Sequence, residues 1–341
     1  MKSKLNKEVK RKLNIVLLII VTLLVLYFSL KDNFNEIINQ IVNMNPWYLL
    51  IAFILLFVFY LFKSLSMYSF CKKINKDFKF RESIQLILRT QFFNAVTPFA
   101  TGGQPYQIYY LKKCGIDYAS STGIVLQNFI VYQIALVLLG LIALFVNQTF
   151  NLFEGSKLLA RLIALGFITN TVVIVIMFMV AFSKKMNKRI IGFGIKILTK
   201  LKIVKNREEK LKEWDININN FYDSAKKLLD DKKIFVGNII FNFLALCTHY
   251  MIPLFVLYAM GEFNVINAGI SIVACAYVMI IGSFVPIPGG TGGLEYGFVT
   301  FFGNFITGSK LSALMLVWRF ITYYFSMILG AIALNIKKVR K

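Results

Sequence analysis

Residues 124–146 read IVLQNFIVYQIALVLLGLIALFV, a stretch without a charged side chain and long enough to cross the roughly 30 Å of hydrocarbon in a bilayer. Four further runs share this apolar character: Leu13–Leu30, Trp47–Phe62, Leu162–Phe182 and Leu311–Leu334. Hydrophobic residues make up 57% of the 341-residue chain and charged residues 16%, against about 25% charged in a soluble domain. The sequence therefore predicts an all-α polytopic membrane protein. It excludes a soluble enzyme, a nucleic-acid-binding domain and a disulfide-stapled secreted module.

The charges indicate how the spans are oriented. The net charge is +23, and the basic clusters adjoin the apolar runs, as expected for cytoplasmic loops that face anionic lipid headgroups rather than nucleic acid. Walking along the chain with this rule gives six clear spans, with both termini cytoplasmic, in a bacterial cytoplasmic membrane. Within the single integral domain 1–341, segment 183–233 is basic and has apolar residues at helical spacing. We expect it to form cytoplasmic amphipathic helices on the membrane surface.

Two apolar segments do not fit simple spanning helices. Segments 82–115 and 265–308 each contain helix-like sequence on both sides of a Pro/Gly-rich interruption. Broken backbone at membrane depth is tolerated only where protein buries it or where it lines a watery cavity. We interpret both segments as re-entrant hairpins that enter from opposite faces of the membrane. A second interpretation, in which 265–285 and 294–308 cross fully, gives eight spans.

The two interruptions resemble each other. Residues 98–106 (PFATGGQPY) and 288–296 (PGGTGGLEY) both read P-x-x-T-G-G-x-x-Y. Hairpins of opposite entry that share a motif indicate an inverted repeat, an arrangement in which transporters bind substrate between discontinuous helices near mid-membrane. A helix opening after each Gly pair, from about Tyr106 and Glu295, would direct exposed N–H groups and the positive end of its dipole at an anion such as a lipid phosphate. Close helix packing is the alternative role for these glycines.

Charged and polar residues within the apolar segments complete the candidate site. Glu295 and Arg319 are expected either to pair or to leave Arg319 for a phosphate, and Arg89 is a weaker phosphate candidate. Lys63 and Arg161 are expected to extend toward the membrane surface. His249 is interpreted as a core histidine, and no catalytic residue, metal site or cofactor is predicted. The predicted substrate-binding residues are Pro98, Thr101, Gly102, Gly103, Gln104, Pro105, Gln107, Pro288, Gly289, Gly290, Thr291, Gly292, Gly293, Glu295 and Arg319. A polar path, or else interhelical hydrogen bonding, is expected of Gln91, Asn94, Gln104, Gln107, Gln127, Asn128 and Gln133.

Segments 94–111 and 285–295, which contain the two motifs, resemble the lysylphosphatidylglycerol synthase transmembrane-region family. This is the flippase-like membrane domain of the multiple peptide resistance factor proteins. The resemblance implies movement of an anionic or aminoacylated phospholipid to the outer leaflet, and resistance to cationic antimicrobial peptides. Full-length relatives carry a C-terminal domain that transfers lysine from lysyl-tRNA. This chain ends at Lys341, so we expect that domain to be absent and leave enzymatic activity undecided.

The resemblance also leaves a second functional hypothesis open. In it, the chain is the membrane component of a phosphatidylglycerol lysyltransferase whose catalytic domain is a separate polypeptide. The expected partners are a phospholipid, the anionic membrane surface, a separate synthase subunit and a second copy of the chain. No nucleic acid is expected to bind.

Overall fold

Every element in the described part of this computed structural model is helical. The structure describes residues 34–153, 157–182, 222, 230–282, 285 and 287–336. The predicted first span Leu13–Leu30, and segment 183–233 except for its residues 222 and 230–233, lie outside the described residues. The long elements are α3 (Pro46–Ile74), α4 (Phe80–Ala95), α6 (Tyr118–Phe150), α7 (Lys157–Phe182), α10 (Lys232–Tyr250) and α12 (Ala268–Gly282). The shorter ones are α2 (Phe34–Val42), η1 (Pro98–Ala100), α5 (Gly103–Lys113), α11 (Ile252–Ala259), η2 (Pro288–Gly290), α13 (Gly293–Phe302), α14 (Gly308–Arg319), η3 (Phe320–Phe325) and α15 (Ser326–Asn335).

Helix length confirms the membrane class. Among the described residues, four helical segments are long and apolar enough to cross a bilayer: Pro46–Ile74, Tyr118–Phe150, Lys232–Ala259 and Gly308–Asn335. Shorter apolar helices cover Ile163–Ile176 and Ala268–Gly282. The predicted class, a polytopic protein of apolar helices, is therefore correct.

Local sequence fixes where the two longest helices begin and end. Asn45 caps α3 by accepting the Trp47 N–H at 3.0 Å, and Pro46 occupies the first turn, where its missing N–H costs nothing. Asp117 caps α6 by accepting the Ser120 N–H at 2.9 Å. Helix α6 ends at Asn151, which adopts a left-handed conformation with φ of 49°.

Two of the long helical segments, Lys232–Ala259 and Gly308–Asn335, are interrupted. Helix α10 ends at Tyr250 and α11 starts at Ile252, because Pro253 cannot donate the N–H that a continuous helix would need. The last span contains a π-helical turn, η3, between Arg319 and Ser326. Single π-turns inside α-helices are uncommon and are frequent at functional sites.

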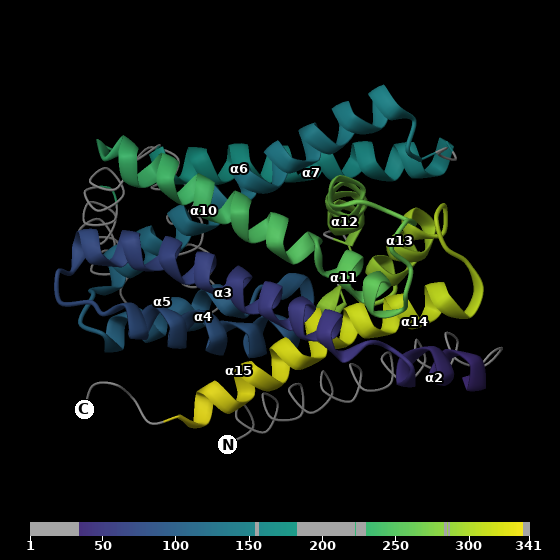
Figure 1. Ribbon diagram of the computed structural model, residues 1–341. Coiled ribbons are helices and arrows are strands. Elements are labelled where there is room, and N and C mark those ends of the chain that lie inside the picture. Colours follow the sequence, from purple (N-terminus) through teal and green to yellow (C-terminus); the bar gives the residue numbers. More distant parts are fainter. Residues whose placement is uncertain are drawn as a thin grey trace, which may run out of the picture.

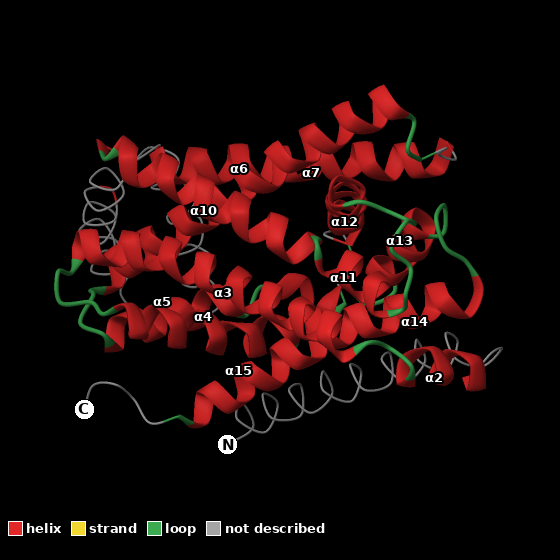
Figure 2. Cartoon of the chain, in the orientation of Figure 1, coloured by secondary structure: helices red, strands yellow, loops and turns green. Residues whose placement is uncertain are grey.

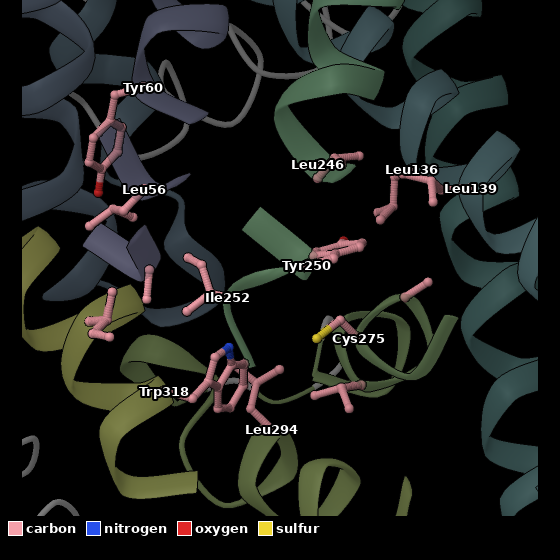
Figure 3. Packing of buried hydrophobic residues seen from close by; sticks show 14 of the residues in the cluster. Leu56, Tyr60, Leu136, Leu139, Leu246, Tyr250, Ile252, Cys275, Leu294 and Trp318 are labelled. Atoms are coloured by element: carbon pink, nitrogen blue, oxygen red, sulfur yellow. The ribbon is translucent and has the colours of Figure 1, made fainter. Parts of the chain in front are cut away.

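The helices form an elongated bundle whose connections gather at its two ends (Figures 1 and 2). Helix α3 packs on α10 and α4, α6 packs on α10, α12 and α7, and α15 packs along α4. The α3–α4 and α5–α6 loops lie at the left end of the view, whereas the loops around α13 and α14 lie at the right end. Tyr60, Leu136, Tyr250, Cys275 and Trp318 come from five different helices and share one buried core (Figure 3).

Both motif segments fold as two helices around a short 3₁₀ turn. The α4–η1–α5 hairpin has both of its connections at the left end of Figure 1, and α12–η2–α13 lies toward the opposite end. The two 3₁₀ turns η1 and η2 contact each other. The fold therefore brings the two copies of the motif together between the ends of the bundle.

Candidate functional site

The first interruption, at η1, has two consecutive residues in the left-handed region. Phe99 has φ of 53° and Ala100 has φ of 52°. The Thr101 hydroxyl donates to the Pro98 carbonyl at 2.9 Å, and the Gly102 N–H donates to Thr97 Oγ1 at 2.8 Å. A left-handed conformation costs a residue with a Cβ roughly 1–2 kcal/mol, so the surrounding contacts hold this turn in a conformation its own residues disfavour.

The second interruption, at η2, repeats that geometry. Gly289 and Gly290, which match Phe99 and Ala100 in the motif, have φ of 70° and 62°. The Thr291 hydroxyl donates to the Pro288 carbonyl at 2.9 Å, as Thr101 does to Pro98. The repeat seen in the sequence is thus also a repeat of positive φ at the two residues after the proline, and of the threonine hydrogen bond.

From the threonine on, the two backbones diverge: ψ is −11° at Thr101 and 138° at Thr291. Gly102 is right-handed, with φ of −72°, whereas Gly292 has φ of 91°. A Cβ on Gly102 would lie 2.7 Å from Thr97 Cγ2 and 2.8 Å from the Phe93 carbonyl oxygen, but a Cβ on Gly292 would meet open space. Positive φ, which glycine adopts without a steric cost, therefore occurs at Gly292 but not at Gly102.

The second glycine of each pair begins a helix and lies close to an earlier part of its own segment. A Cβ on Gly103 would collide with Asn94 and Thr90 of α4, and a Cβ on Gly293 would collide with Val285, in the loop after α12. Helices α5 and α13 therefore begin at Gly103 and Gly293, one turn or less before the predicted starts. Close packing between helices therefore applies to Gly103, whereas Gly293 packs against a loop residue.

Arg319 and Glu295 form a buried ion pair. Arg319 Nε lies 2.7 Å from Glu295 Oε1, and the two side chains are 6% and 9% exposed. Glu295 Oε2 accepts the Gly292 N–H at 2.6 Å, which caps α13. Arg319 Nη2 donates to the Gly289 carbonyl at 3.0 Å and to Thr291 Oγ1 at 3.4 Å. The guanidinium therefore fastens the end of α14 to the second interruption.

Tyr323, in the π-turn, connects the two interruptions. Its hydroxyl donates to the Ala95 carbonyl at the end of α4, at 3.0 Å. Its ring fills the space that a Cβ on Gly289 would need, and the Arg319 guanidinium carbon lies 4.8 Å from the ring centroid. Sequence reasoning missed Tyr323. Its spacing of four residues from Arg319, which places both on one helix face, is the signal that would have found it.

The remaining predicted residues of the first motif differ in how deeply they are buried in the protein. Gln107 is buried and donates to Thr90 Oγ1 at 3.4 Å. Gln104 Oε1 is buried without a hydrogen-bond partner among the described residues. Thr101 and Pro105 are exposed.

The other polar candidates mostly join helices rather than line one path. Asn128 accepts from Ser66 at 2.9 Å, and Gln133 donates to Asn170 at 3.2 Å, so these amides connect α6 to α3 and α7. Arg89 donates through Nε to the Ala333 carbonyl, at 2.9 Å. Its Nη2 donates to the Ile336 carbonyl, also at 2.9 Å, so Arg89 caps the end of α15. His249 is half-buried and lies against Phe59, with ring centroids 4.7 Å apart and ring planes tilted by 45°.

Charge is distributed unevenly between the two ends of the bundle. One end carries basic residues in the last turns of α3 and α5 and the first turn of α10, namely Lys72, Lys73, Lys112, Lys113, Lys232 and Lys233. There Lys73 pairs with Asp231 at 2.6 Å, and this hydrogen bond lowers the pKa of the Asp231 carboxyl. At the other end Lys310 pairs with Glu262. No group of three His, Cys, Asp or Glu side chains within the described ranges is placed to hold a metal ion.

Comparison with known proteins gives relatives of nearly equal length. A UPF0104 membrane protein of Archaeoglobus fulgidus is 24% identical over 350 residues, covering 94% of this chain and 96% of the relative. A UPF0104 membrane protein of Methanocaldococcus jannaschii is 26% identical over 346 residues, covering 99% and 97%. The family model described as the lysylphosphatidylglycerol synthase TM region matches residues 14–330. With both motifs inside that match, the chain belongs to the lysylphosphatidylglycerol synthase TM region family.

Proposed function

We propose that this protein is a flippase-like carrier of an anionic or aminoacylated phospholipid, with the headgroup passing between the two interrupted hairpins. The contact between η1 and η2 carries this proposal, because it joins two helix interruptions of matching sequence and backbone conformation. Interrupted helices that meet inside a membrane protein expose N–H groups and helix N-termini, which favour phosphate.

The proposed orientation follows from the charged ends. The basic end of the bundle faces the cytoplasm, since Lys and Arg concentrate in cytoplasmic loops, and both termini lie on that side of the cell membrane. The first hairpin then enters from the cytoplasm and the second from outside, as an inverted repeat. Six to eight crossings fit this arrangement.

Each part of the site has its own role in this proposal. The exposed, open Gly292 lets a headgroup approach the start of α13. The Gly292 N–H is taken by the Glu295 carboxylate, whose charge Arg319 balances, so the other N–H groups of the first turn and the helix dipole are what favour negative charge there. Arg319 fixes the shape of the second interruption through Glu295 and the Gly289 carbonyl, and does not bind the headgroup itself. Tyr323 holds the two interruptions in contact.

In the cell, this activity would contribute to envelope lipid metabolism. An aminoacylated lipid delivered to the outer leaflet lowers the negative charge of the surface and would protect against cationic antimicrobial peptides. A separate synthase subunit would supply such a lipid, and a second copy of the chain is a further candidate partner.

The test is transbilayer movement of fluorescent phosphatidylglycerol in proteoliposomes, followed by chemical quenching of the outer leaflet. Wild-type protein should move the lipid faster than protein-free vesicles, and Gly292→Leu should slow it by at least roughly tenfold, because a side chain at φ of 91° strains the turn and covers the helix start. Gly261→Leu is the matched control, since Gly261 also has positive φ, 81°, with open space around it, but lies in the loop after α11. Equal rates for wild-type vesicles and empty vesicles would refute the proposal.

A further inference from the structure

Lys63 is a basic residue far from either end of a long apolar helix. Residues 63 to 74 of α3 rise about 16 Å, more than a lysine side chain can span, so the ammonium does not reach the end of the helix. It turns inward instead. Its Nζ donates to Asn242 Oδ1 of α10 at 2.9 Å and lies 4.3 Å from the centroid of the Tyr132 ring of α6. The expectation that Lys63 extends to the membrane surface is therefore wrong.

The surroundings of Lys63 are polar but neutral. Asn242 is fully buried and donates through Nδ2 to Ser66 Oγ at 2.9 Å. Ser66 Oγ in turn donates to Asn128 Oδ1 at 2.9 Å. We call Lys63, Ser66, Asn128, Tyr132 and Asn242 the Lys63 cluster. It joins α3, α6 and α10, none of which contains an interrupted motif.

Lys63 differs from the other inward-facing cations because nothing in the described part of the protein balances its charge. Arg319 has the Glu295 carboxylate at 2.7 Å. Arg89 has two carbonyls at the negative end of α15. Within the described residues, none of the ion pairs involves Lys63, whose contacts are an amide oxygen and an aromatic face. A cation at membrane depth is costly unless an opposite charge meets it, so the missing anion points to a ligand.

We infer that the Lys63 cluster is a second binding site, which takes the phosphate of an anionic membrane lipid. Lys63 supplies the charge, and the Asn128 amide, whose oxygen accepts from Ser66, supplies a neutral donor through its Nδ2. The Ser66 hydroxyl and the Asn242 amide donate within the protein and hold Asn128 and Lys63 in place. Lys63 is half-buried, so part of its side chain lies at the surface of the described helices, next to the cluster. The inference rests on the proposed function in taking a lipid as ligand, but binding here is measured separately from movement.

The experiment measures lipid binding by native mass spectrometry of the full chain, with phosphatidylglycerol and phosphatidylcholine added separately. The variant is Lys63→Gln, which removes the charge but keeps a side-chain donor for Asn242. Phosphatidylglycerol affinity should fall roughly tenfold, the order expected for one charge-assisted contact, while phosphatidylcholine affinity stays within twofold. Lys63→Arg should retain most of the preference.

Lys72→Met is the matched control, because Lys72 is an exposed lysine in the last turn of the same helix, and it should bind both lipids as wild type does. A final arm adds inorganic phosphate. If it displaces phosphatidylglycerol only when Lys63 is present, the site recognises phosphate whatever its source; if it displaces nothing, the site requires the lipid. Lys63→Met is made as well, to match the Lys72→Met control. Unchanged phosphatidylglycerol affinity in a folded Lys63→Gln or Lys63→Met variant would overturn the inference, even if lipid movement by the wild type is established.

Discussion

The ion pair between Arg319 and Glu295 allows a quantitative test of its structural role. Replacing Arg319 by Gln leaves the Glu295 carboxylate, 9% exposed, without its counter-charge. Breaking a buried pair in this way costs about 3–5 kcal/mol. The hydrogen bond to the Gly289 carbonyl is lost as well, so the free energy of unfolding should fall by an amount near the upper end of that range.

The double variant Arg319→Gln with Glu295→Gln removes the isolated charge. The amide oxygen that replaces the Glu295 carboxylate can still accept the Gly292 N–H, so the cap of α13 is kept. Only the Arg319 contacts to Gly289 and Thr291 remain lost, which leaves a net cost of about 1–2 kcal/mol. If Arg319 only shapes the turn, lipid movement should recover together with stability.

The assay is reversible unfolding in mixed micelles, measured beside lipid movement for each variant. Lys310→Gln with Glu262→Gln is the control pair, because its side chains are 44% and 24% exposed and such pairs contribute at most about 1 kcal/mol. A double variant as unstable as Arg319→Gln would refute the pairing argument. A stable but inactive double variant would place Arg319 at the headgroup.

Further variants test the role of Tyr323, the packing of Gly293, the membrane orientation and the Lys73–Asp231 contact. Tyr323→Phe should cost about 1 kcal/mol of unfolding free energy and slow lipid movement, since the Ala95 carbonyl loses its donor; an unchanged rate would show that Tyr323 does not couple the interruptions. Gly293→Leu should destabilise the protein by more than Gly292→Leu does, because only Gly293 packs against Val285, and unfolding titrations compare the two. A cysteine placed at exposed Asn304 should react with an impermeant reagent from outside, and a cysteine at exposed Asp77 should react only after permeabilisation. The reverse pattern would invert the orientation. The Lys73–Asp231 contact stabilises the fold above the unfolded pKa of the carboxyl and is lost as the pH falls through its lowered folded value; Asp231→Asn should remove this part of the acid sensitivity of unfolding.

The sequence predicted those features that depend on local pattern. Apolar length predicted the helices, and Pro and Gly beside threonine marked both interruptions. The scarcity of buried charge made a Glu295–Arg319 pair one of two expected arrangements, and the structure contains that pair. A repeated motif was enough to predict that the two interruptions share a geometry. The structure adds that the shared geometry ends at the threonine.

The features that the sequence did not predict depend on which helix faces which. A lysine in an apolar run looks the same whether it extends to the surface or turns inward, and only the position of Asn242 on α10 decides the direction of Lys63. Tyr323 is one of many aromatic residues, and its role follows from the π-turn that directs it between Ala95 and Gly289. Positive φ at Phe99 and Ala100 opposes their local preference, so only contacts from elsewhere in the fold explain it.

Photolabelling determines whether a lipid headgroup reaches the meeting point of the two interruptions. Phosphatidylglycerol carrying a photoreactive group on its headgroup would be irradiated with the protein in vesicles, and the adducts mapped by peptide mass spectrometry. Adducts are expected in peptides containing 98–106 and 288–296, and they should be lost when unlabelled phosphatidylglycerol is in excess. Adducts confined to peptides from the two ends of the bundle, with neither motif labelled, would contradict this expectation.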